Sequence, residues 1–494
     1  MSPSTKIVEP LEVKDRPQPE MFGVRLMAVW LWSIVAVGAV LRLVALGRKS
    51  FWLDEIASVG TARLPAHDFW SVLWHSEGNM ALYYVALRPW LHLGVGEGSV
   101  RALSAIIGIA SIPVMYALAN RLFGANAARL AALFFALNAC AIAVSQEARG
   151  YSLLLLGVIA STYLWVCLVE RPTFGLACAY GAVAGLTLYG HYFGMLVPAA
   201  QAVSLMALPP AKRPWKQFAL AACMVALAAV PVLWMIHIQD IGHIAWVQKP
   251  SWLELYHLGV YLAAGGGKAV GAILLLIELL LLALFLRSLK ELWRERDQDL
   301  RCWRYVLVAS CLLTPTLIAL LVSVVRPIFY HRFLIISLPA WVLATAIGAE
   351  EILSRRWRWA CIACICALSL ASAITFYQRV QEDWRGVARY LIAQAHPEDR
   401  VLYYQAVGYF AAEPYRDWLP GGSTPRPQGI RAEASDGDWQ KEIDGAARVW
   451  LVLYRAKPDD PTARAIDANL RSRYKMVQEV SFRAVTVIEY RAEK

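Results

Sequence analysis

Residues 24–55 read VRLMAVWLWSIVAVGAVLRLVALGRKSFWLDE, a long apolar run followed by two adjacent carboxylates. A helix of about 20 apolar residues is enough to cross a bilayer core, and residues 24–46 reach that length. Ten more runs of this kind follow, at 101–120, 128–145, 152–170, 174–190, 193–209, 218–236, 268–286, 305–325, 333–349 and 359–377. The sequence therefore predicts an α-helical, multi-pass membrane protein with about eleven transmembrane helices, the first of them a retained signal anchor.

The composition agrees with many membrane spans. Of the 494 residues, 58% are hydrophobic and 17% are charged, and there are 20 Trp and 21 Tyr. The mean hydropathy is +0.46. These values exclude disordered, fibrous and small disulfide-rich proteins. The net charge of +11 could suggest nucleic acid as a partner, but most of it falls in short loops between spans, so no nucleic-acid binding is expected.

The orientation follows from the loops that carry Lys and Arg, because such loops stay on the cytoplasmic side. An N-terminus in the cytoplasm, with residues 1–23 as its tail, puts the basic residues of every second loop inside. These residues are Arg121, Arg129, Arg171, Lys212, Arg213, Lys216, Arg287, Lys290, Arg294, Arg296, Arg301, Arg304, Arg355, Arg356 and Arg358. An odd number of spans then places the C-terminus outside.

The composition changes near residue 378, which we take as a domain boundary. Residues 378–494 contain 18 Lys and Arg and 17 Asp and Glu. Their patterns predict helices at 384–394 and 461–472, strands at 400–404, 448–454, 475–481 and 484–490, and a loop at 419–429. We expect a small α/β extracytoplasmic domain that either caps the outer face or binds the acceptor of a reaction. None of the nine cysteines lies in it, which excludes a disulfide framework or zinc site there.

The membrane domain, residues 24–377, has a long first outer loop at 47–100. Two aromatic segments of this loop, 68–74 and 82–87, are expected to lie at the membrane interface. A crossing by residues 80–95 would turn the Arg-rich loops outward, so we predict that this segment does not cross.

Two acidic residues follow the first span directly, Asp54 and Glu55, beside an aromatic anchor. Ionisable residues at the edge of a membrane are costly and often functional. A carboxylate pair against apolar surface can act as a general base on a hydroxyl group. The alternative is a solvated acidic turn.

Cations on the outer face lie in three other loops. Arg149, in the second outer loop, suits phosphate recognition or forms a structural ion pair with Glu147. Arg326 and Arg332 follow in the loop before the tenth span, and Lys249 lies in the loop 237–267. We expect these cations to face the acidic pair, an arrangement that a lipid phosphate would require. A glycine run at 265–267 lacks the ending of a nucleotide-binding loop.

The order of several motifs resembles the GT-C integral-membrane glycosyltransferases, in particular the bacterial relatives of protein O-mannosyltransferases and of the lipid A aminoarabinose transferase (glycosyltransferase family 39-like). The motifs are FWLDE at 51–55, LYY at 82–84, VRALSA at 100–105, RLFG at 121–124 and SQEARGYSL at 145–153. The resemblance covers about residues 45–170 and returns at 326–339 and 383–385. One departure is Asn79-Met80-Ala81-Leu82-Tyr83, where relatives commonly have Pro-Pro-Leu-Tyr after a polar residue.

The resemblance implies an enzyme of the bacterial inner membrane that takes a sugar from a polyprenyl-phosphate carrier. It would pass the sugar, with inversion, to a lipid, polysaccharide or protein on the outer face. In that case Asp54 is the catalytic base, Glu55 is its acidic neighbour, and Arg149 binds the donor phosphate with Arg332 and with Arg326 or Lys249.

Further side chains near these loops are candidates for substrate binding: Glu147, Tyr151, Tyr83, Tyr84, His191, Tyr330 and His331. No cofactor is required, although a divalent metal ion held by Asp54, Glu55, His75, Glu77 or His191 is an open alternative. Two other function classes remain: an oligosaccharide ligase or polymerase that uses a pyrophosphate-linked lipid, and a lipid or sugar transporter without enzymatic activity.

Overall fold

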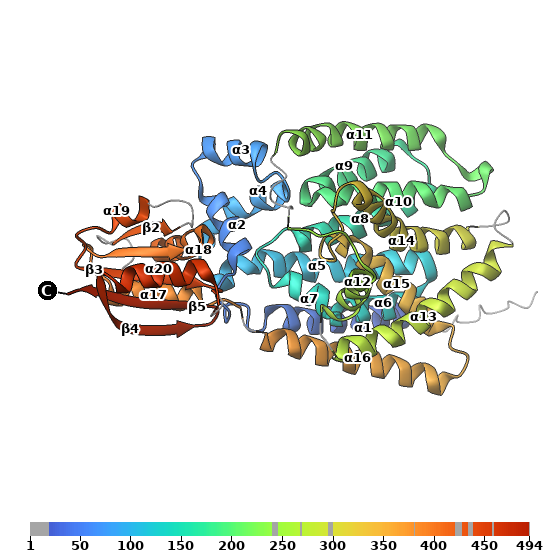
Figure 1. Cartoon of the computed structure of the whole chain (residues 1–494). Helices are drawn as coiled ribbons and strands as arrows, with labels where there is room; N and C mark the ends of the chain where they lie inside the picture. Colours follow the sequence, from blue (N-terminus) through green and yellow to red (C-terminus); the bar gives the residue numbers. More distant parts are fainter. Residues whose placement is uncertain are drawn as a thin grey trace, which may run out of the picture.

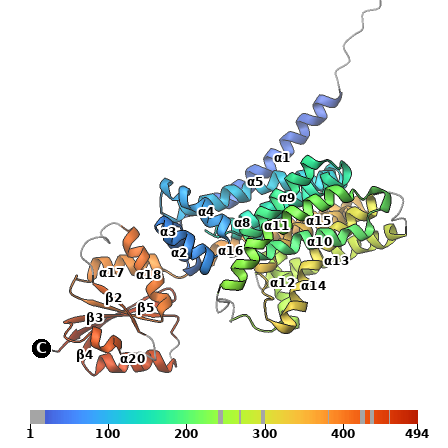
Figure 2. The same cartoon turned by 90° about the horizontal axis from the view of Figure 1, so that it is seen from above.

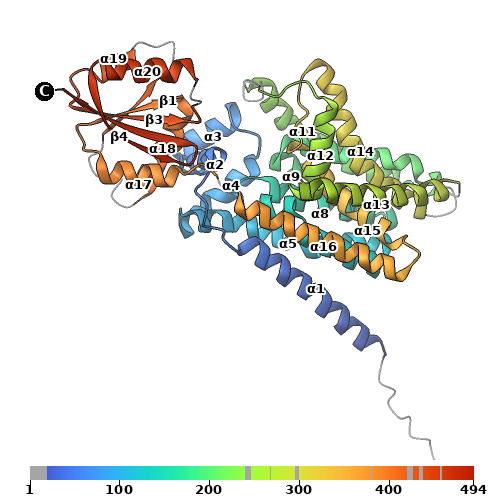
Figure 3. The same ribbon diagram turned by 60° about the horizontal axis from the view of Figure 1, so that its bottom comes forward.

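The computed structural model describes residues 19–239, 246–266, 269–294, 300–379, 381–419, 427–432, 438–456 and 459–493. Within these ranges the chain forms a large helical part and a smaller C-terminal part built on one β-sheet (Figure 1). Figures 2 and 3 show the sheet beyond helices α2 (Leu53–Arg63) and α3 (Ala66–His75), at one end of the helical bundle.

The helices confirm a multi-pass membrane protein. Seven helical segments are long and apolar enough to span: α5 (Glu97–Phe123), α8 (Tyr151–Glu170), α11 (Trp215–Ile238), α13 (Ala269–Trp293), α14 (Arg301–Val325), η6 with α15 (Phe333–Glu350) and α16 (Arg355–Gln378). A bent pair, α6 (Ala125–Leu137) and α7 (Ala139–Ser145), makes an eighth if it is one span. Three shorter apolar helical segments lie at Ala28–Leu43 of α1 (Pro19–Leu43), in α9 (Phe174–Gly190) and at Tyr192–Ala207.

Each of the eleven predicted spans coincides with one of these segments, of which seven or eight are long and apolar enough to cross a membrane, so eleven crossings stay a prediction. The segment Tyr192–Ala207 consists of η2 (Tyr192–Met195), α10 (Leu196–Ser204) and η3 (Leu205–Ala207). Two further elements of the helical part are η4 (Pro210–Lys212) and α12 (Trp252–Ala264).

The bend of 56° between α6 and α7 is stabilised by two polar side chains. The Asn138 side chain caps α7, because its Oδ1 accepts a hydrogen bond from the Ala141 backbone amide at 3.0 Å. The Nδ2 group of the same side chain donates to the Leu262 carbonyl at 2.8 Å. Arg42 of α1 donates to the Ala136 carbonyl at 3.0 Å. Backbone groups freed by a break inside a membrane need such partners.

The first outer loop folds as α2, α3, α4 (Ala81–Trp90) and the short turn η1 (Leu91–Leu93). Helix α4 has ten residues, which rise only about 15 Å and cannot cross a bilayer core alone. Tyr83 and Tyr84 are fully buried, because α4 packs against α2, α5 and α9. These two side chains therefore face the protein interior, whereas Trp70 of α3 is exposed, and the place of both segments at the membrane interface stays a prediction.

The C-terminal sheet has the strand order β2-β1-β3-β5-β4. Its strands are β1 (Arg400–Tyr404), β2 (Gln428–Ala432), β3 (Arg448–Tyr454), β4 (Tyr474–Phe482) and β5 (Val485–Ala492). Strand β1 pairs in parallel with β2 and β3, while β5 is antiparallel to both β3 and β4. Helices α17 (Trp384–Gln394) and α20 (Pro461–Arg471) lie where the sequence predicted them.

Three elements of this part were not predicted: α18 (Ala406–Trp418), β2 and α19 (Asp438–Glu442). Most of the predicted loop at 419–429, namely 420–426, lies outside the described residues. Helix α18 contains Pro414, which obscures a helical pattern, yet it packs against α2 and so connects the sheet part to the first outer loop.

Candidate active site

Asp54 lies in the first turn of α2, where the helix dipole favours a negative charge. Its side chain is 39% exposed, and one carboxylate oxygen lies 3.8 Å from Nη2 of Arg149. Such a long, partly exposed contact leaves the carboxylate oxygens open to another partner.

Glu55, the next residue, is completely buried and faces the interior. Its two oxygens each lie 2.7 Å from a nitrogen of Arg101 on α5, and one also accepts from the Ala148 amide at 2.8 Å. The other oxygen accepts a hydrogen bond from the Trp52 amide at 3.3 Å, and this hydrogen bond caps the start of α2. Glu55 therefore holds α2, α5 and the loop of Arg149 together, and it does not reach the cavity described below.

Arg149 lies in the turn between α7 and α8 and points toward α2. Its Nη1 donates to the Tyr84 hydroxyl at 3.1 Å, the Ser58 hydroxyl at 3.3 Å and the Asp54 carbonyl at 3.4 Å. The predicted alternative, a structural pair between Arg149 and Glu147, is wrong, because Glu147 binds another arginine.

That arginine is Arg332, at the N-terminal edge of η6 (Phe333–Ser337). Its Nη2 donates to Oε2 of Glu147 at 2.5 Å. The guanidinium group lies over the rings of Trp52 and Tyr151, at 5.0 and 5.1 Å from the ring centres. These contacts keep a positive charge in place in the cavity that Asp54 also lines.

Asp54, Arg149 and Arg332 line one cavity of about 700 Å³. Arg326, Tyr151 and Tyr330 line it as well, so these six predicted site residues share this space. Its apolar wall is formed by Trp52, Phe193, Met195, Leu196, Ile236, Ile328 and Phe333. One space therefore combines a carboxylate, three guanidinium groups and an apolar lining.

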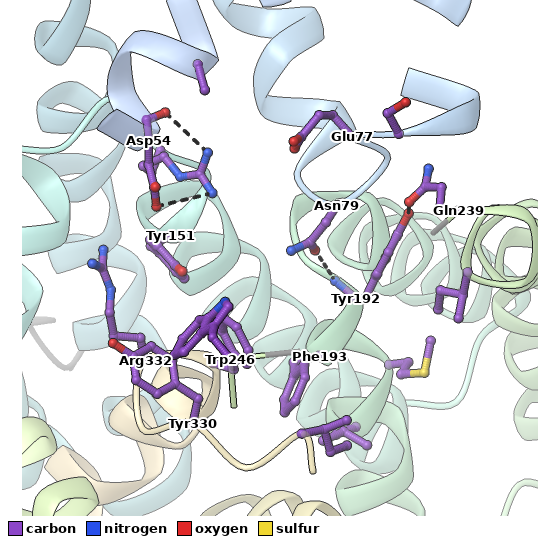
Figure 4. A pocket seen from close by; sticks show the side chains of 18 of the residues that line it. Asp54, Glu77, Asn79, Tyr151, Tyr192, Phe193, Gln239, Trp246, Tyr330 and Arg332 are labelled. Atoms are coloured by element: carbon purple, nitrogen blue, oxygen red, sulfur yellow. Dashed lines mark hydrogen bonds and ion pairs between the residues drawn. The ribbon is translucent and has the colours of Figure 1, made fainter. Parts of the chain in front are cut away.

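The cavity has a second polar side. Figure 4 shows Asp54, Tyr151 and Arg332 on one side and Glu77, Asn79, Tyr192 and Gln239 on the other. The Tyr192 hydroxyl donates to Gln239 at 3.0 Å, and the Tyr192 amide donates to Asn79 at 3.0 Å. Gly78 is required there, because a Cβ atom would lie 2.4 Å from the Tyr192 hydroxyl oxygen.

Other predicted residues lie behind the cavity wall. The Tyr83 hydroxyl lies 3.0 Å from the Ser104 hydroxyl, and the Tyr84 hydroxyl accepts a hydrogen bond from Arg149. His191 is buried, and burial lowers its pKa to about 3, so its imidazole is neutral. His331 contacts the rings of Tyr330 and Tyr261, and burial lowers its pKa too.

Two predicted residues do not join the site. Lys249 is exposed and does not line the cavity, so the structure does not place it with Arg149, Arg326 and Arg332. His75 is exposed and contacts the Ser71 carbonyl at 2.9 Å. Asp240 and His243, which belong to the same outer loop as Lys249, lie outside the described residues.

The described residues contain no cluster of three or more His, Cys, Asp or Glu side chains that could hold a metal ion. Of the five acidic and histidine residues predicted for a metal, Asp54 and Glu77 line the cavity, whereas Glu55, His75 and His191 do not. A divalent cation in the cavity therefore stays a prediction for two of these residues only.

Solved structures with this arrangement of helices exist. ArnT from Cupriavidus metallidurans in the apo state matches 95% of this chain over 98% of its own length, with a TM-score of 0.60 and 13% identity. The chain has the GT-C glycosyltransferase fold. The same ArnT bound to undecaprenyl phosphate matches this GT-C chain with a TM-score of 0.58, 13% identity and the same coverage of both chains.

A second GT-C relative is the oligosaccharyltransferase AglB from Archaeoglobus fulgidus, solved with an inhibitory peptide and a dolichol-phosphate. It matches 87% of this chain over 70% of its own, with a TM-score of 0.54 and 11% identity. The family model described as dolichyl-phosphate-mannose-protein mannosyltransferase matches residues 79–236, which run from the loop before α4 to the end of α11. No curated protein matches the chain.

Sequence reasoning missed several residues of the GT-C cavity, among them Trp52, Tyr192 and Gln239. Trp52 could have been found, since it lies two residues before Asp54 in the motif at 51–55. Tyr192 and Gln239 carry no such signal, because only the packing of η2 and α11 against the loop after α3 brings them to the cavity.

Proposed function

We propose that this protein transfers a sugar from a polyprenyl-phosphate carrier to an acceptor hydroxyl group, with inversion at the anomeric carbon. The observation that carries the proposal is the cavity itself, which joins the Asp54 carboxylate to the guanidinium groups of Arg149 and Arg332. A base and anion-binding groups in one partly apolar space are what this reaction needs.

The arginine residues suit the phosphate of the donor. Guanidinium groups bind phosphate oxygens through paired, charge-assisted hydrogen bonds. Arg326 is exposed and lines the cavity without a protein partner among the described residues, so it adds a third cation for the phosphate. The ArnT structure with undecaprenyl phosphate and the AglB structure with a dolichol-phosphate support a lipid phosphate as ligand of this fold.

In the proposed step, the oxygen of the acceptor hydroxyl group bonds to the anomeric carbon while Asp54 accepts the proton of that hydroxyl group. The bond between that carbon and the phosphate oxygen breaks, and its electron pair leaves with the polyprenyl phosphate. Arg149 and Arg332 stabilise the negative charge of this leaving group. A single displacement inverts the anomeric centre.

The sugar would lie between the arginine side of the cavity and the opposite polar side. Glu77, Asn79 and Gln239 offer a carboxylate and two amides there, which can bind hydroxyl or amino groups of the sugar. The apolar wall would hold the first isoprene units of the carrier.

The reaction would take place on the outer face of a bacterial inner membrane, with the N-terminus in the cytoplasm. The positions of Lys and Arg in alternate loops support this orientation. The acceptor could be a lipid, a glycan or a protein, and each contains the hydroxyl group that the proposed step requires.

A donor panel tests the proposal. The purified protein in lipid nanodiscs is incubated with polyprenyl-phosphate sugars of several kinds, and released polyprenyl phosphate is measured with and without a lipid acceptor. We expect release from at least one donor of this class. Release only from a pyrophosphate-linked oligosaccharide, with a whole chain found in the product by mass spectrometry, would contradict the proposal and favour a ligase.

A further inference from the structure

The segment before α2 is held from two sides. Its carbonyl groups accept hydrogen bonds from Arg101 of the membrane domain, with Nη1 donating to Leu46 at 3.0 Å and Lys49 at 2.8 Å, and Nη2 donating to Ser50 at 3.0 Å. Because Arg101 also binds Glu55, one buried side chain fixes both the segment and the start of α2.

The C-terminal part holds the same segment from the opposite side. The Arg385 amide donates to the Ser50 hydroxyl at 3.1 Å, and its guanidinium group donates to the carbonyls of Gly47 at 3.3 Å and Arg48 at 2.9 Å. The same guanidinium group lies 3.2 Å from a carboxylate oxygen of Glu97.

Among these hydrogen bonds between the C-terminal part and the segment, the one with Tyr415 of α18 lies nearest to Asp54 along the chain. The Tyr415 hydroxyl accepts from the Phe51 amide at 2.7 Å and donates to Glu97 at 2.8 Å. Tyr415 is only 2% exposed, and its ring centre lies 5.9 Å from that of Phe51, which Trp418 also contacts. The Phe51 amide is therefore held by the C-terminal part in a buried contact.

We propose that the C-terminal domain orders the segment that carries Asp54, with Tyr415 as a positioning residue that acts through the Phe51 amide. Only Trp52 and Leu53 separate Phe51 from Asp54, and Trp52 itself lines the cavity. A displaced carboxylate is a poor base, since small errors in the geometry of reacting groups cost large factors in rate. The consequence for transfer rests on the proposed function, whereas the ordering does not.

This role differs from both functions considered for residues 378–494. A passive cap would leave the rate unchanged when one hydroxyl group is lost. An acceptor platform would mainly change the KM for the acceptor. A positioning role lowers kcat and leaves the KM for the donor unchanged, because the arginine residues of the cavity are not touched.

The test compares Tyr415→Phe with Tyr409→Phe in the full-length protein in nanodiscs. Tyr409 lies on the same helix, and its ring faces Tyr403, Phe410 and Arg431, so its variant loses the same atom without touching residues 47–51. Hydrogen exchange of the amides of residues 51–55 reports the order of the segment, and donor turnover reports the consequence.

In Tyr415→Phe we expect exchange in this segment to become about tenfold faster and kcat to fall about tenfold, the effect of leaving one buried amide without its acceptor. Tyr409→Phe should behave like the wild type in both respects. Unchanged exchange in Tyr415→Phe overturns the proposal, whether or not the wild type turns over any donor.

Faster exchange with an unchanged kcat overturns the link from order to catalysis. If the wild type turns over no donor, the proposed function fails on its own, and the exchange data still decide whether the C-terminal domain orders the segment.

Discussion

Asp54 and Glu55 are neighbours in the chain but lie in opposite environments. Successive residues of a helix point about 100° apart, so Asp54 faces the cavity and Glu55 faces the packed interior. Asp54 is 39% exposed with its arginine at 3.8 Å, whereas Glu55 is 0% exposed with its arginine at 2.7 Å.

The difference teaches how to separate a reactive carboxylate from a structural one. The oxygens of Glu55 are fully used by Arg101 and two backbone amides. Those of Asp54 keep free hydrogen-bonding positions in a cavity large enough for a sugar. The two carboxylates look alike in the sequence, yet only that of Asp54 lines the cavity.

Removing the charge of Glu55 should have the largest effect on stability. In Glu55→Gln the buried guanidinium group of Arg101 loses its counterion, which costs about 3–5 kcal/mol of the free energy of unfolding. Denaturation of the detergent-solubilised protein measures this, with Asp54→Asn as the matched control that should stay near the wild type. A stable Glu55→Gln protein that lacks transfer activity would instead place Glu55 in the reaction.

Arg149→Ala tests the cavity side of the comparison. Loss of a charge-assisted contact of about 1.5–3 kcal/mol should weaken the affinity for polyprenyl phosphate roughly 10- to 100-fold, measured by titration in nanodiscs. Lys249→Ala, which removes an exposed cation outside the cavity, is the control and should bind normally. Equal weakening in both variants would contradict the assignment of the phosphate to the cavity.

Glu77→Gln tests the second polar side of the cavity. A carboxylate that binds sugar hydroxyl groups contributes about 1.5 kcal/mol, so the KM for the preferred donor should rise roughly tenfold. The affinity for sugar-free polyprenyl phosphate should not change. If both affinities fell together, Glu77 would act on the phosphate side of the cavity instead.

Lys49 offers a smaller effect on the structural side. Burial lowers its pKa to about 8, with the charge of Arg101 acting in the same direction. Between about pH 8 and its usual pKa near 10.4, the unfolded chain binds a proton that the folded chain does not. The contribution of Lys49 to stability therefore increases as the pH rises through this window. Thermal unfolding against pH should show this slope in the wild type and less of it in Lys49→Met.

The spans could be predicted from the sequence, because a bilayer demands long apolar segments wherever the chain crosses. Every predicted span coincides with an apolar helical segment. The break at Asn138 could not be predicted, since the groups that stabilise it lie far away in sequence. Arg42 of α1 binds the Ala136 carbonyl, and Asn138 itself donates to a carbonyl near the end of α12.

The site could be predicted in part. Asp54 and Arg149 stand out as polar residues at the ends of apolar runs, and the structure brings them together. The partners of Glu55 and Glu147 could not be assigned, because Arg101 and Arg332 lie 46 and 185 residues away. Glu55 carried the same signal as Asp54, and only its burial separates the two.

The most direct test of the central claim is transfer by Asp54→Asn. The amide keeps the shape of the side chain but cannot accept the proton of the acceptor. We predict that the rate of sugar transfer falls at least about 100-fold, while the unfolding temperature and the affinity for polyprenyl phosphate stay at wild-type values. Transfer at the wild-type rate by this variant would contradict the assignment of Asp54 as the base.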